Sequence, residues 1–569
     1  MSRNEIQPRE RPSEAQVQRQ HDPDAWWRHG VVYQIYPRSF QDSNGDGIGD
    51  LAGIRQRLGY LEELGVDAIW ISPFYPSPMA DFGYDVADYC NVDEIFGTLA
   101  DFDALLADAH GRGMKVILDF VPNHTSDQHP WFRQSRRSRD SDLRDFYIWR
   151  DSAADGGPPN NWRSNFGGLA WTRDEPKGQW YYHAFLPQQP DLNWRNPRVR
   201  KCMFDAMRFW LARGVDGFRV DVIWHLIKDA QFRHNPPNPA WRPGDPESKS
   251  VLQVYSCDRP ELMETIADMR SVVAEFDTPQ SSRVLIGEIY LPIERLVAFY
   301  APDEAGAIKG VQLPFNFHLV SAHWQAAALA DLIRRYDTAI PVNGWPNWVL
   351  GNHDQPRIAS RIGHARAALA AMLLLTLRGT PTLYYGDEIG MQDVDLPDEA
   401  LRDPAGLREP GKGLGRDPER TPMPWDGTAG GGFSNAEPWL PLGADHRERN
   451  VEAALRDTGS MLSLYRALLG LRRREPALHA GAIEAVEAAG ELLTFDRVLD
   501  GSRLRIEINF GEEPSFSLEG SDDHRLLFST AAFRPDRGTD SKRPQPSSQE
   551  SCDSSGRLLP FVGRILRLG

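Results

Sequence analysis

Eight short apolar runs alternate along this chain with segments whose apolar residues recur at helical spacing. The segment 54–64, which places Ile54, Leu58, Leu61 and Leu64 on one face, is an example of the helical pattern. Strands that alternate with helices pair in parallel, and eight such units predict a closed (β/α)8 barrel, an α/β fold. The predicted strands are Val31–Tyr36, Val66–Ile71, Met114–Phe120, Asp216–Asp221, Val284–Glu288, Val311–Phe315, Trp348–Asn352 and Thr380–Tyr385.

The ends of these predicted strands carry polar residues. Side chains alternate between the two faces of a strand, so Arg219 and Asp221 point one way while Phe218 and Val220 point the other. The C-terminal ends of barrel strands form the active face of such a fold. Three carboxylates, an arginine and two histidines are therefore predicted to converge on one mouth. The polar residues that follow the other strands are Asn123, His124, Glu288, His353 and Asp354.

Two segments do not fit the barrel pattern. Residues 125–194 are too many for a barrel connection and are rich in Trp and Tyr, which predicts an inserted subdomain that covers the mouth as a lid. After a helical stretch at 460–474, short alternating runs at 492–495, 504–510, 526–528 and 564–568 predict an antiparallel β domain. The predicted division is a disordered leader (1–24), the barrel (25–124 and 195–480), the inserted subdomain (125–194) and the C-terminal β domain (481–569), within which 536–555 is a polar, flexible loop.

Composition narrows the classes of partner. The formal net charge of −16 argues against nucleic acid, because no basic stripe is present to neutralise phosphates. No apolar run reaches the length of a membrane helix, so we expect no membrane partner. The expected protein is a cytoplasmic enzyme. Its expected form is a monomer or a homodimer. The four cysteines lack the spacing of a disulfide framework or a zinc site; they are Cys90, Cys202, Cys257 and Cys552.

The loop after the first predicted strand has the composition of a calcium site. Alternating oxygen ligands and a glycine suit a hard cation, and the first half matches an EF-hand loop. Gly53 stands where the closing glutamate of an EF-hand belongs, so the loop is not an EF-hand. An Asx-rich turn without metal is the alternative. The candidate ligands are Asp42, Asn44, Asp46, the Ile48 carbonyl and Asp50.

Four segments in this order resemble the α-amylase family of retaining glycosidases, glycoside hydrolase family 13. They are DFVPNH (119–124), GFRVD (217–221), GE (287–288) and GNHD (351–354). The resemblance extends from about Trp26 to the C-terminus. The segments QPDLN (189–193) and DFGYD (81–85) are similar to the α-glucosidase and oligo-1,6-glucosidase branch.

The resemblance implies roles for individual residues. Asp221 is expected to be the nucleophile, Glu288 the general acid and base, and Asp354 the third carboxylate, which grips sugar hydroxyls. Arg219 is expected to keep Asp221 ionised. The calcium-like loop also matches a structural ion site of this branch, and no organic cofactor is expected. The expected sugar-binding residues are His124 and His353, with Asp81, Tyr84 and Arg420 closing the non-reducing end so that the enzyme is exo-acting.

Linkage preference stays open at this stage. Val222 resembles members that cut α-1,6 bonds, whereas 223–229 looks more like bacterial α-glucosidases that cut maltose-type ends. We expect an α-glucosidase that releases glucose from maltose and similar small oligosaccharides, with transglucosylation open. The alternatives are an oligo-1,6-glucosidase and a sucrose or maltose isomerase-type glucosyltransferase. A non-catalytic amylase-like binding protein is a remote alternative, since such relatives lack members of the carboxylate trio.

Overall fold

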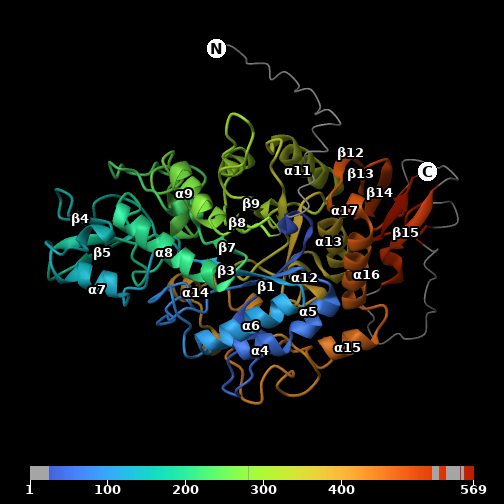
Figure 1. The fold of residues 1–569 in the computed structure, drawn as a ribbon, viewed down its shortest axis with the longest axis horizontal. Helices are drawn as coiled ribbons and strands as arrows, with labels where there is room; N and C mark the ends of the chain where they lie inside the picture. The colour runs from blue at the N-terminus through green and yellow to red at the C-terminus, as the bar shows by residue number, and fades with distance from the viewer. Residues whose placement is uncertain (1–24, 280, 516–523, 534–550, 553–556, 569) are drawn as a thin grey trace, which may run out of the picture.

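Eight parallel strands close into a barrel at the centre of the molecule, in the order β1-β11-β10-β9-β8-β7-β3-β2 (Figure 1). The computed structural model describes residues 25–279, 281–515, 524–533, 551–552 and 557–568. Each predicted apolar run overlaps one barrel strand, so the predicted (β/α)8 fold is confirmed. The strands are β1 (Val32–Ile35), β2 (Ala68–Ile71), β3 (Lys115–Phe120), β7 (Gly217–Val220), β8 (Val284–Gly287), β9 (Leu313–Asn316), β10 (Asn347–Val349) and β11 (Thr380–Tyr384).

Helices surround this barrel, and their ends carry recognisable stop and start residues. In α6 (Leu99–Gly111), Thr98 and Asp101 form a capping box. In α8 (Pro197–Arg213), Gly214 follows the last turn with φ 108°, a conformation that glycine adopts without strain. The other helices are α2 (Trp26–His29), α3 (Pro37–Phe40), α4 (Leu51–Gln56), α5 (Leu58–Leu64), α7 (Pro130–Arg137), α9 (Leu262–Ala274), α10 (Ile293–Leu296), α11 (Ala326–Ala339), α12 (Ile358–Ile362), α13 (His364–Thr376), α14 (Pro404–Arg408), α15 (Val451–Arg456), α16 (Met461–Arg474) and α17 (Pro476–His479).

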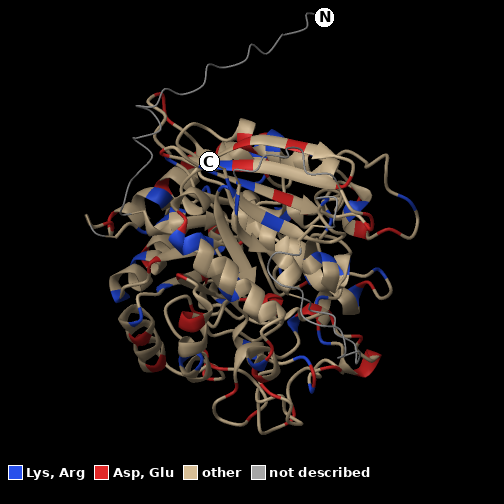
Figure 2. Cartoon of the chain, turned by 90° about the vertical axis from the view of Figure 1, so that its right-hand side faces the viewer, with Lys and Arg blue, Asp and Glu red and all other residues tan. Residues whose placement is uncertain are grey.

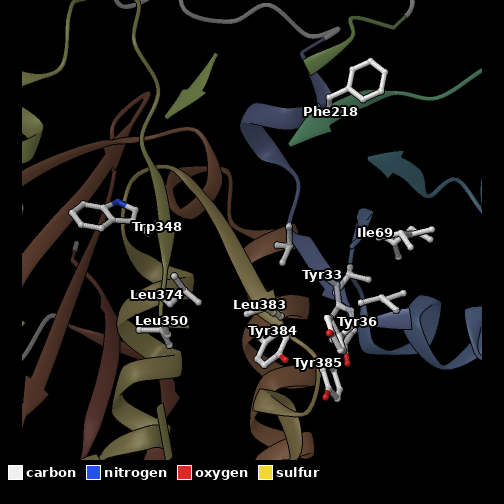
Figure 3. Packing of buried hydrophobic residues seen from close by; sticks show 14 of the residues in the cluster. Tyr33, Tyr36, Ile69, Phe218, Trp348, Leu350, Leu374, Leu383, Tyr384 and Tyr385 are labelled. Atoms are coloured by element: carbon white, nitrogen blue, oxygen red, sulfur yellow. The ribbon is translucent and has the colours of Figure 1, made fainter. Parts of the chain in front are cut away.

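The two faces of the barrel strands pack into two separate cores because side chains alternate along a strand. Val32, Trp70 and Ile117 belong to the cluster inside the barrel. Tyr33, Ile69, Phe218 and Leu383 point outward into the larger core, shown in Figure 3 with Leu374 of α13. Phe218 and Val220 thus lie on the outer face, and Arg219 lies on the inner one with its guanidinium 5.0 Å from the Trp70 ring.

Between β3 and α8 the chain leaves the barrel. This inserted segment contains α7 and a three-stranded antiparallel sheet, drawn in teal at the left of Figure 1. It has a small core of its own that includes Trp162, Trp171 and Tyr182. The strands are β4 (Trp149–Asp151), β5 (Trp171–Asp174) and β6 (Gln179–Tyr182), in the order β4-β6-β5.

The C-terminal part folds into a five-stranded antiparallel sheet in the order β12-β13-β14-β16-β15, which confirms the predicted β domain. The sequence analysis missed β12, because its residues are mostly exposed and rich in Ala and Glu, and a register shift between Glu484 and Glu487 interrupts its pairing. Acidic and basic residues are interspersed on this side of the molecule (Figure 2). The strands are β12 (Ala482–Ala489), β13 (Leu492–Leu499), β14 (Ser502–Asn509), β15 (Arg525–Ser529) and β16 (Gly563–Arg567).

Two predictions concern parts of the chain that the structure does not describe. The predicted leader at 1–24 lies outside the described residues, as does the predicted loop at 536–555 apart from Ser551 and Cys552. Within the described ranges, none of the helices combines the length and apolar character needed to cross a membrane.

Candidate active site

Arg219 lies at the centre of the barrel mouth and contacts three carboxylates. It is fully buried on the inner face of β7, opposite Asp119 in the register between β3 and β7. Its Nη1 donates to Asp119 Oδ1 and to Asp221 Oδ1, each at 2.8 Å, and its Nη2 lies 2.7 Å from Glu288 Oε2. One cation therefore holds the residues after β7 and β8 together with the end of β3.

The backbone of Val222 orients Glu288. Val222 has φ 35°, in the left-handed region that β-branched residues rarely adopt, and its N–H donates to Glu288 Oε2 at 2.8 Å. Oε2 thus faces both this N–H and the Arg219 guanidinium. Because both groups favour a negative oxygen, a proton on Glu288 belongs on the other oxygen, Oε1.

The pKa of Asp221 differs from the expectation. Arg219 contacts it as predicted, but burial raises the pKa of Asp221 well above its usual range, and the charge of Glu288 adds to the rise that Arg219 opposes. Burial also raises the pKa of Glu288, together with the charge of Asp354. Arg219 lowers the pKa of Asp221, in the expected direction, but burial outweighs it because this guanidinium is shared among three carboxylates. The pair Asp221 and Glu288 is therefore built to hold a proton.

Asp354 has the opposite electrostatic environment. Its Oδ1 accepts hydrogen bonds from Arg416 Nη1 and Arg420 Nη2, both at 2.9 Å, and its Oδ2 lies 3.3 Å from His353 Nε2. Although burial alone would raise it, these neighbours lower the pKa of Asp354 well below its usual range. Asp354 is thus ionised wherever the protein is folded at ordinary pH.

The neighbouring His353 is neutral and fixed in orientation. Burial lowers its pKa well below the ordinary value. The amide Nε2 of Gln34 donates to His353 Nδ1 at 2.8 Å, which leaves the ring hydrogen on Nε2, facing Asp354. The Tyr84 ring stacks on the imidazole with centroids 5.2 Å apart, and the Tyr84 hydroxyl donates to Asp119 Oδ2 at 2.9 Å.

The sequence analysis missed Arg416, which closes one end of the site. Arg416 bridges Asp354 to Asp81 at 2.7 Å and also pairs with Asp403 at 2.6 Å. Arg420, the predicted pocket residue, is fully buried behind Asp354 and donates to the His353 carbonyl oxygen at 2.7 Å. Arg416 and Arg420 stand on either side of residues 417–419. The presence of another arginine four residues before Arg420 was the signal in the sequence that could have identified Arg416.

The inserted segment contributes the opposite wall. Gln189 Nε2 donates to Asp81 Oδ2 at 3.0 Å and lies 3.2 Å from His124 Nε2. The fully buried Lys228, from the segment after β7, pairs with Asp191 at 2.5 Å and donates to Asn123 Oδ1 at 2.7 Å. Gln189, which lines the cavity, was also missed as a site residue, although the sequence QPDLN that contains it was recognised. Lys228 was missed as well; it lies outside the lining and holds the inserted segment to the end of β3.

These walls enclose a cavity of about 410 Å³. Arg219 and Arg420 lie beneath its surface and hold residues that reach it. Aromatic residues from three segments add to the lining: Phe166 and Phe185 of the inserted segment, Trp224 after β7 and Tyr290 after β8. The predicted site residues that line the cavity are Asp81, Tyr84, His124, Asp221, Glu288, His353 and Asp354.

The loop 42–50 has the geometry of successive Asx turns. Asp42, Asn44 and Asp46 each accept a hydrogen bond from the backbone N–H two residues later. Asp50 caps α4 through Gly53 N at 2.7 Å. Among the described residues, no group of three or more His, Cys, Asp and Glu side chains has a metal-binding arrangement.

The donor types of this loop nevertheless suit a hard cation, since they are carboxylate, amide and carbonyl oxygens. The side-chain oxygens of Asn44 and Asp46 each accept one hydrogen bond and keep a free lone pair, whereas each oxygen of Asp42 already accepts two, so an ion would replace some of those bonds. Although burial opposes it, hydrogen bonds from Ser434, Gly45 and Gly47 lower the pKa of Asp42, so this carboxylate is ionised.

Comparison with known proteins shows which family and which solved structures this chain is similar to. The family model of the alpha amylase catalytic domain matches residues 34–481. The chain is 44% identical over 506 residues to a probable alpha-glucosidase of Rhizobium meliloti (strain 1021), covering 86% of this chain and 91% of that protein. It is 38% identical over 531 residues to an oligo-1,6-glucosidase of Parageobacillus thermoglucosidasius, covering 87% and 92%.

Two solved structures are also similar to this chain in fold and sequence. The structure of the alpha-glucosyl transfer enzyme XgtA has a TM-score of 0.87 at 38% identity, covering 96% of this chain and 99% of that one. The trehalulose synthase MutB from Pseudomonas mesoacidophila MX-45 has a TM-score of 0.82 at 34% identity, covering 96% and 99%. The resemblance seen in the sequence is thereby confirmed, and the chain belongs to the α-amylase family of glycoside hydrolases.

Proposed function

We propose that this glycoside hydrolase is a retaining, exo-acting α-glucosidase that releases α-glucose from the non-reducing ends of short α-glucosides such as maltose. The observation that carries the proposal is the contact of one guanidinium, Arg219, with both Asp221 and Glu288. A retaining enzyme needs its two carboxyl groups about 5 Å apart so that one attacks the sugar while the other protonates the leaving oxygen.

In the first step Asp221 attacks the anomeric carbon and Glu288 gives its proton to the glycosidic oxygen. The bond between this carbon and oxygen breaks, the shortened sugar leaves as an alcohol, and a glucosyl ester of Asp221 forms. The proton comes from Oε1, because Oε2 faces Arg219 and the Val222 N–H. The ionised Asp354 lies in the cavity wall, where its charge stabilises the cation-like transition state.

In the second step Glu288, now ionised, takes a proton from water, and the resulting hydroxide attacks the anomeric carbon. The ester bond to Asp221 breaks and α-glucose leaves, with its original configuration restored by two inversions. Burial and the charge of Asp354 raise the pKa of Glu288, which suits a group that donates and then accepts a proton near neutral pH.

The closed end of the pocket supports exo action. Arg416 joins Asp81 and Asp354 across the cavity wall, which leaves room for a terminal sugar and no passage for a continuing chain. Hydroxyls of that sugar would meet fixed carboxylates and the Nε2–H of His353.

A comparison of substrates tests the proposed α-glucosidase activity directly. Initial rates on maltose, isomaltose, sucrose and starch are expected to be fastest for maltose, with NMR showing α-glucose as the first product. Much faster cleavage of isomaltose would instead establish an oligo-1,6-glucosidase, the activity named for the Parageobacillus relative. Conversion of sucrose into an isomer would instead establish the isomerase-type transferase.

Replacing Arg416 with glutamine is expected to lower kcat/KM on maltose by roughly 100-fold or more, because three carboxylates lose a buried charge partner. Kinetics on maltose measure the effect. Arg402→Gln, an exposed arginine of the same loop that donates to backbone carbonyl oxygens, is the matched control. A kcat/KM for Arg416→Gln within twofold of the wild type would show that the pocket is closed by other groups.

We also propose that the loop 42–50 binds a structural Ca²⁺ through Asp42, Asn44, Asp46, the Ile48 carbonyl and Asp50. Adding Ca²⁺ to EDTA-treated protein is expected to raise Tm by roughly 2–5 °C, because an ion that binds only the folded state stabilises it. The exposed Asp46 has few other contacts, so Asp46→Ala should abolish the shift. Asp88→Ala removes an exposed carboxylate from another Asx turn and should preserve it. Equal Tm values with and without Ca²⁺ would favour the metal-free turn.

A cytoplasmic location, in monomeric or homodimeric form, is part of the same proposal. Its support is the state of the cysteines, all four of which are free in the structure. Free cysteines are usual in reducing compartments. Fractionation of cells and light scattering of the purified protein measure location and mass.

A further inference from the structure

A second cavity, of about 480 Å³, lies between the inserted segment and the chain that follows β7. It is built from β4, β6 and the residues after α7, at the left of Figure 1, with Phe232 on its other side. Four arginines line it: Arg139, Arg144, Arg150 and Arg195. Asp145 is the one acidic residue of the lining, although the chain as a whole has a net charge of −16.

Two of these arginines have neutral partners only. Arg144 donates to the Ser135 carbonyl oxygen at 3.0 Å and to Gln179 Oε1 at 2.6 Å. Arg150 donates to the Trp149 carbonyl oxygen at 2.8 Å. Within the described part of the chain, no carboxylate lies within ion-pair distance of either guanidinium. Arg139 and Arg195 pair with Asp151 and Glu261 at 3.1 and 2.9 Å, so the positive charge without an ion-pair partner is that of Arg144 and Arg150.

Aromatic rings hold both guanidiniums in place. Arg144 lies over the Trp149 ring at 3.4 Å and Arg150 over the Phe232 ring at 3.9 Å. Such stacking holds the planar guanidinium in one orientation before a ligand arrives, so that binding costs little side-chain entropy. Burial lowers the pKa of Arg144 to about 10, against the charges of Asp174 and Asp151, and Arg139 adds to the lowering. Burial also lowers the pKa of Arg150, against the charge of Asp145, and Arg195 adds to the lowering. Arg144 and Arg150 thus keep guanidinium N–H groups without an ion-pair partner at the cavity, and an anion between them would supply one.

We propose that this cavity binds a phosphate group, either as the free ion or carried by a small phosphorylated sugar. Arginine forks match the oxygens of a phosphate group by paired hydrogen bonds, which a compact lysine cannot reproduce. The cavity is large enough for a small organic ligand and not only for an ion. The site is separate from the catalytic cavity, since the two share no lining residue.

Calorimetric titration with inorganic phosphate, and with glucose 6-phosphate in saturating glucose to fill the catalytic pocket, tests the proposal. The wild type is expected to bind one phosphate per chain. The variant Arg150→Gln/Arg195→Gln should bind at least tenfold more weakly. The control Arg133→Gln/Arg137→Gln removes two exposed arginines of α7 that do not line the cavity, and should bind within twofold of the wild type. A Tm within 2 °C of the wild type is required of both variants.

The two ligands distinguish the sources of the phosphate group. Tenfold tighter binding of glucose 6-phosphate would identify a phosphorylated sugar, and equal affinities would identify the ion. No saturable binding, or equal weakening in the two double variants, would overturn the proposal. If the first variant is unstable, wild-type crystals grown with selenate decide the question. An anomalous peak between Arg144 and Arg150 supports the site, and peaks elsewhere alone overturn it.

Discussion

Replacing Asp221 with alanine is expected to lower kcat on maltose by on the order of 10⁴-fold or more, because no covalent intermediate can form without the nucleophile. Asp221 is the carboxylate that the Arg219 Nη1 holds at 2.8 Å on the cavity wall. Alanine removes the carboxylate and leaves space for a small external anion. Added azide should therefore restore part of the rate on an activated substrate such as p-nitrophenyl α-glucoside.

The product of this rescue identifies the mechanism. Azide that enters from the side of the missing carboxylate inverts the anomeric carbon once, so NMR should show β-glucosyl azide. Asp245→Ala, an exposed carboxylate of the segment after β7, is the matched control and should keep wild-type kinetics. Unchanged hydrolysis by Asp221→Ala, or an α-configured azide product, would rule out the assigned nucleophile.

Replacing Glu288 with glutamine is expected to lower kcat/KM on maltose by roughly 10³-fold, since the sugar alcohol can no longer leave with a proton. The loss in kcat/KM should be much smaller for p-nitrophenyl α-glucoside, whose leaving group needs no proton. Glu304→Gln, an exposed control, should leave both substrates unaffected. Equal losses on the two substrates would contradict the role of general acid.

The direction in which kcat/KM changes with pH tests the same role of Glu288 as the general acid. Burial and the charge of Asp354 raise the pKa of Glu288, and the acid form is the active one. Wild-type kcat/KM on maltose should therefore be present below this raised pKa and be lost as pH rises through it. Glutamine carries no titrating proton, so this alkaline limb should vanish in the variant. Asp354, whose pKa is lowered, contributes no change across the same range. An alkaline limb that persists in Glu288→Gln would assign it to another group.

Sequence reasoning reached the barrel and the three carboxylates of the cavity because both have local signals. The barrel strands are apolar runs, and Asp221, Glu288 and Asp354 follow such runs at strand ends. β12 gave no such signal, because an exposed strand of Ala and Glu has no apolar face.

The residues that the sequence analysis missed act through long-range contacts. Arg416 meets Asp81 across 335 positions, and Lys228 meets Asn123 across 105. No spacing along a chain predicts which of two nearby arginines reaches a distant carboxylate. The raised pKa of Asp221 has a similar origin, since Arg219 is shared with Asp119 of β3 and with Glu288 after β8, both far away along the chain.

Because the ion pairs of Arg416 close one end of the pocket, they also determine which property of the substrate supply limits such an enzyme. A pocket closed at one end admits only chain termini, so its turnover depends on how many molecules are dissolved and not on their total mass. A gram of disaccharide offers far more termini than a gram of long polymer. Upstream cleavage of polymer into fragments would therefore multiply the flux of glucose without any change in this protein's own rate constants.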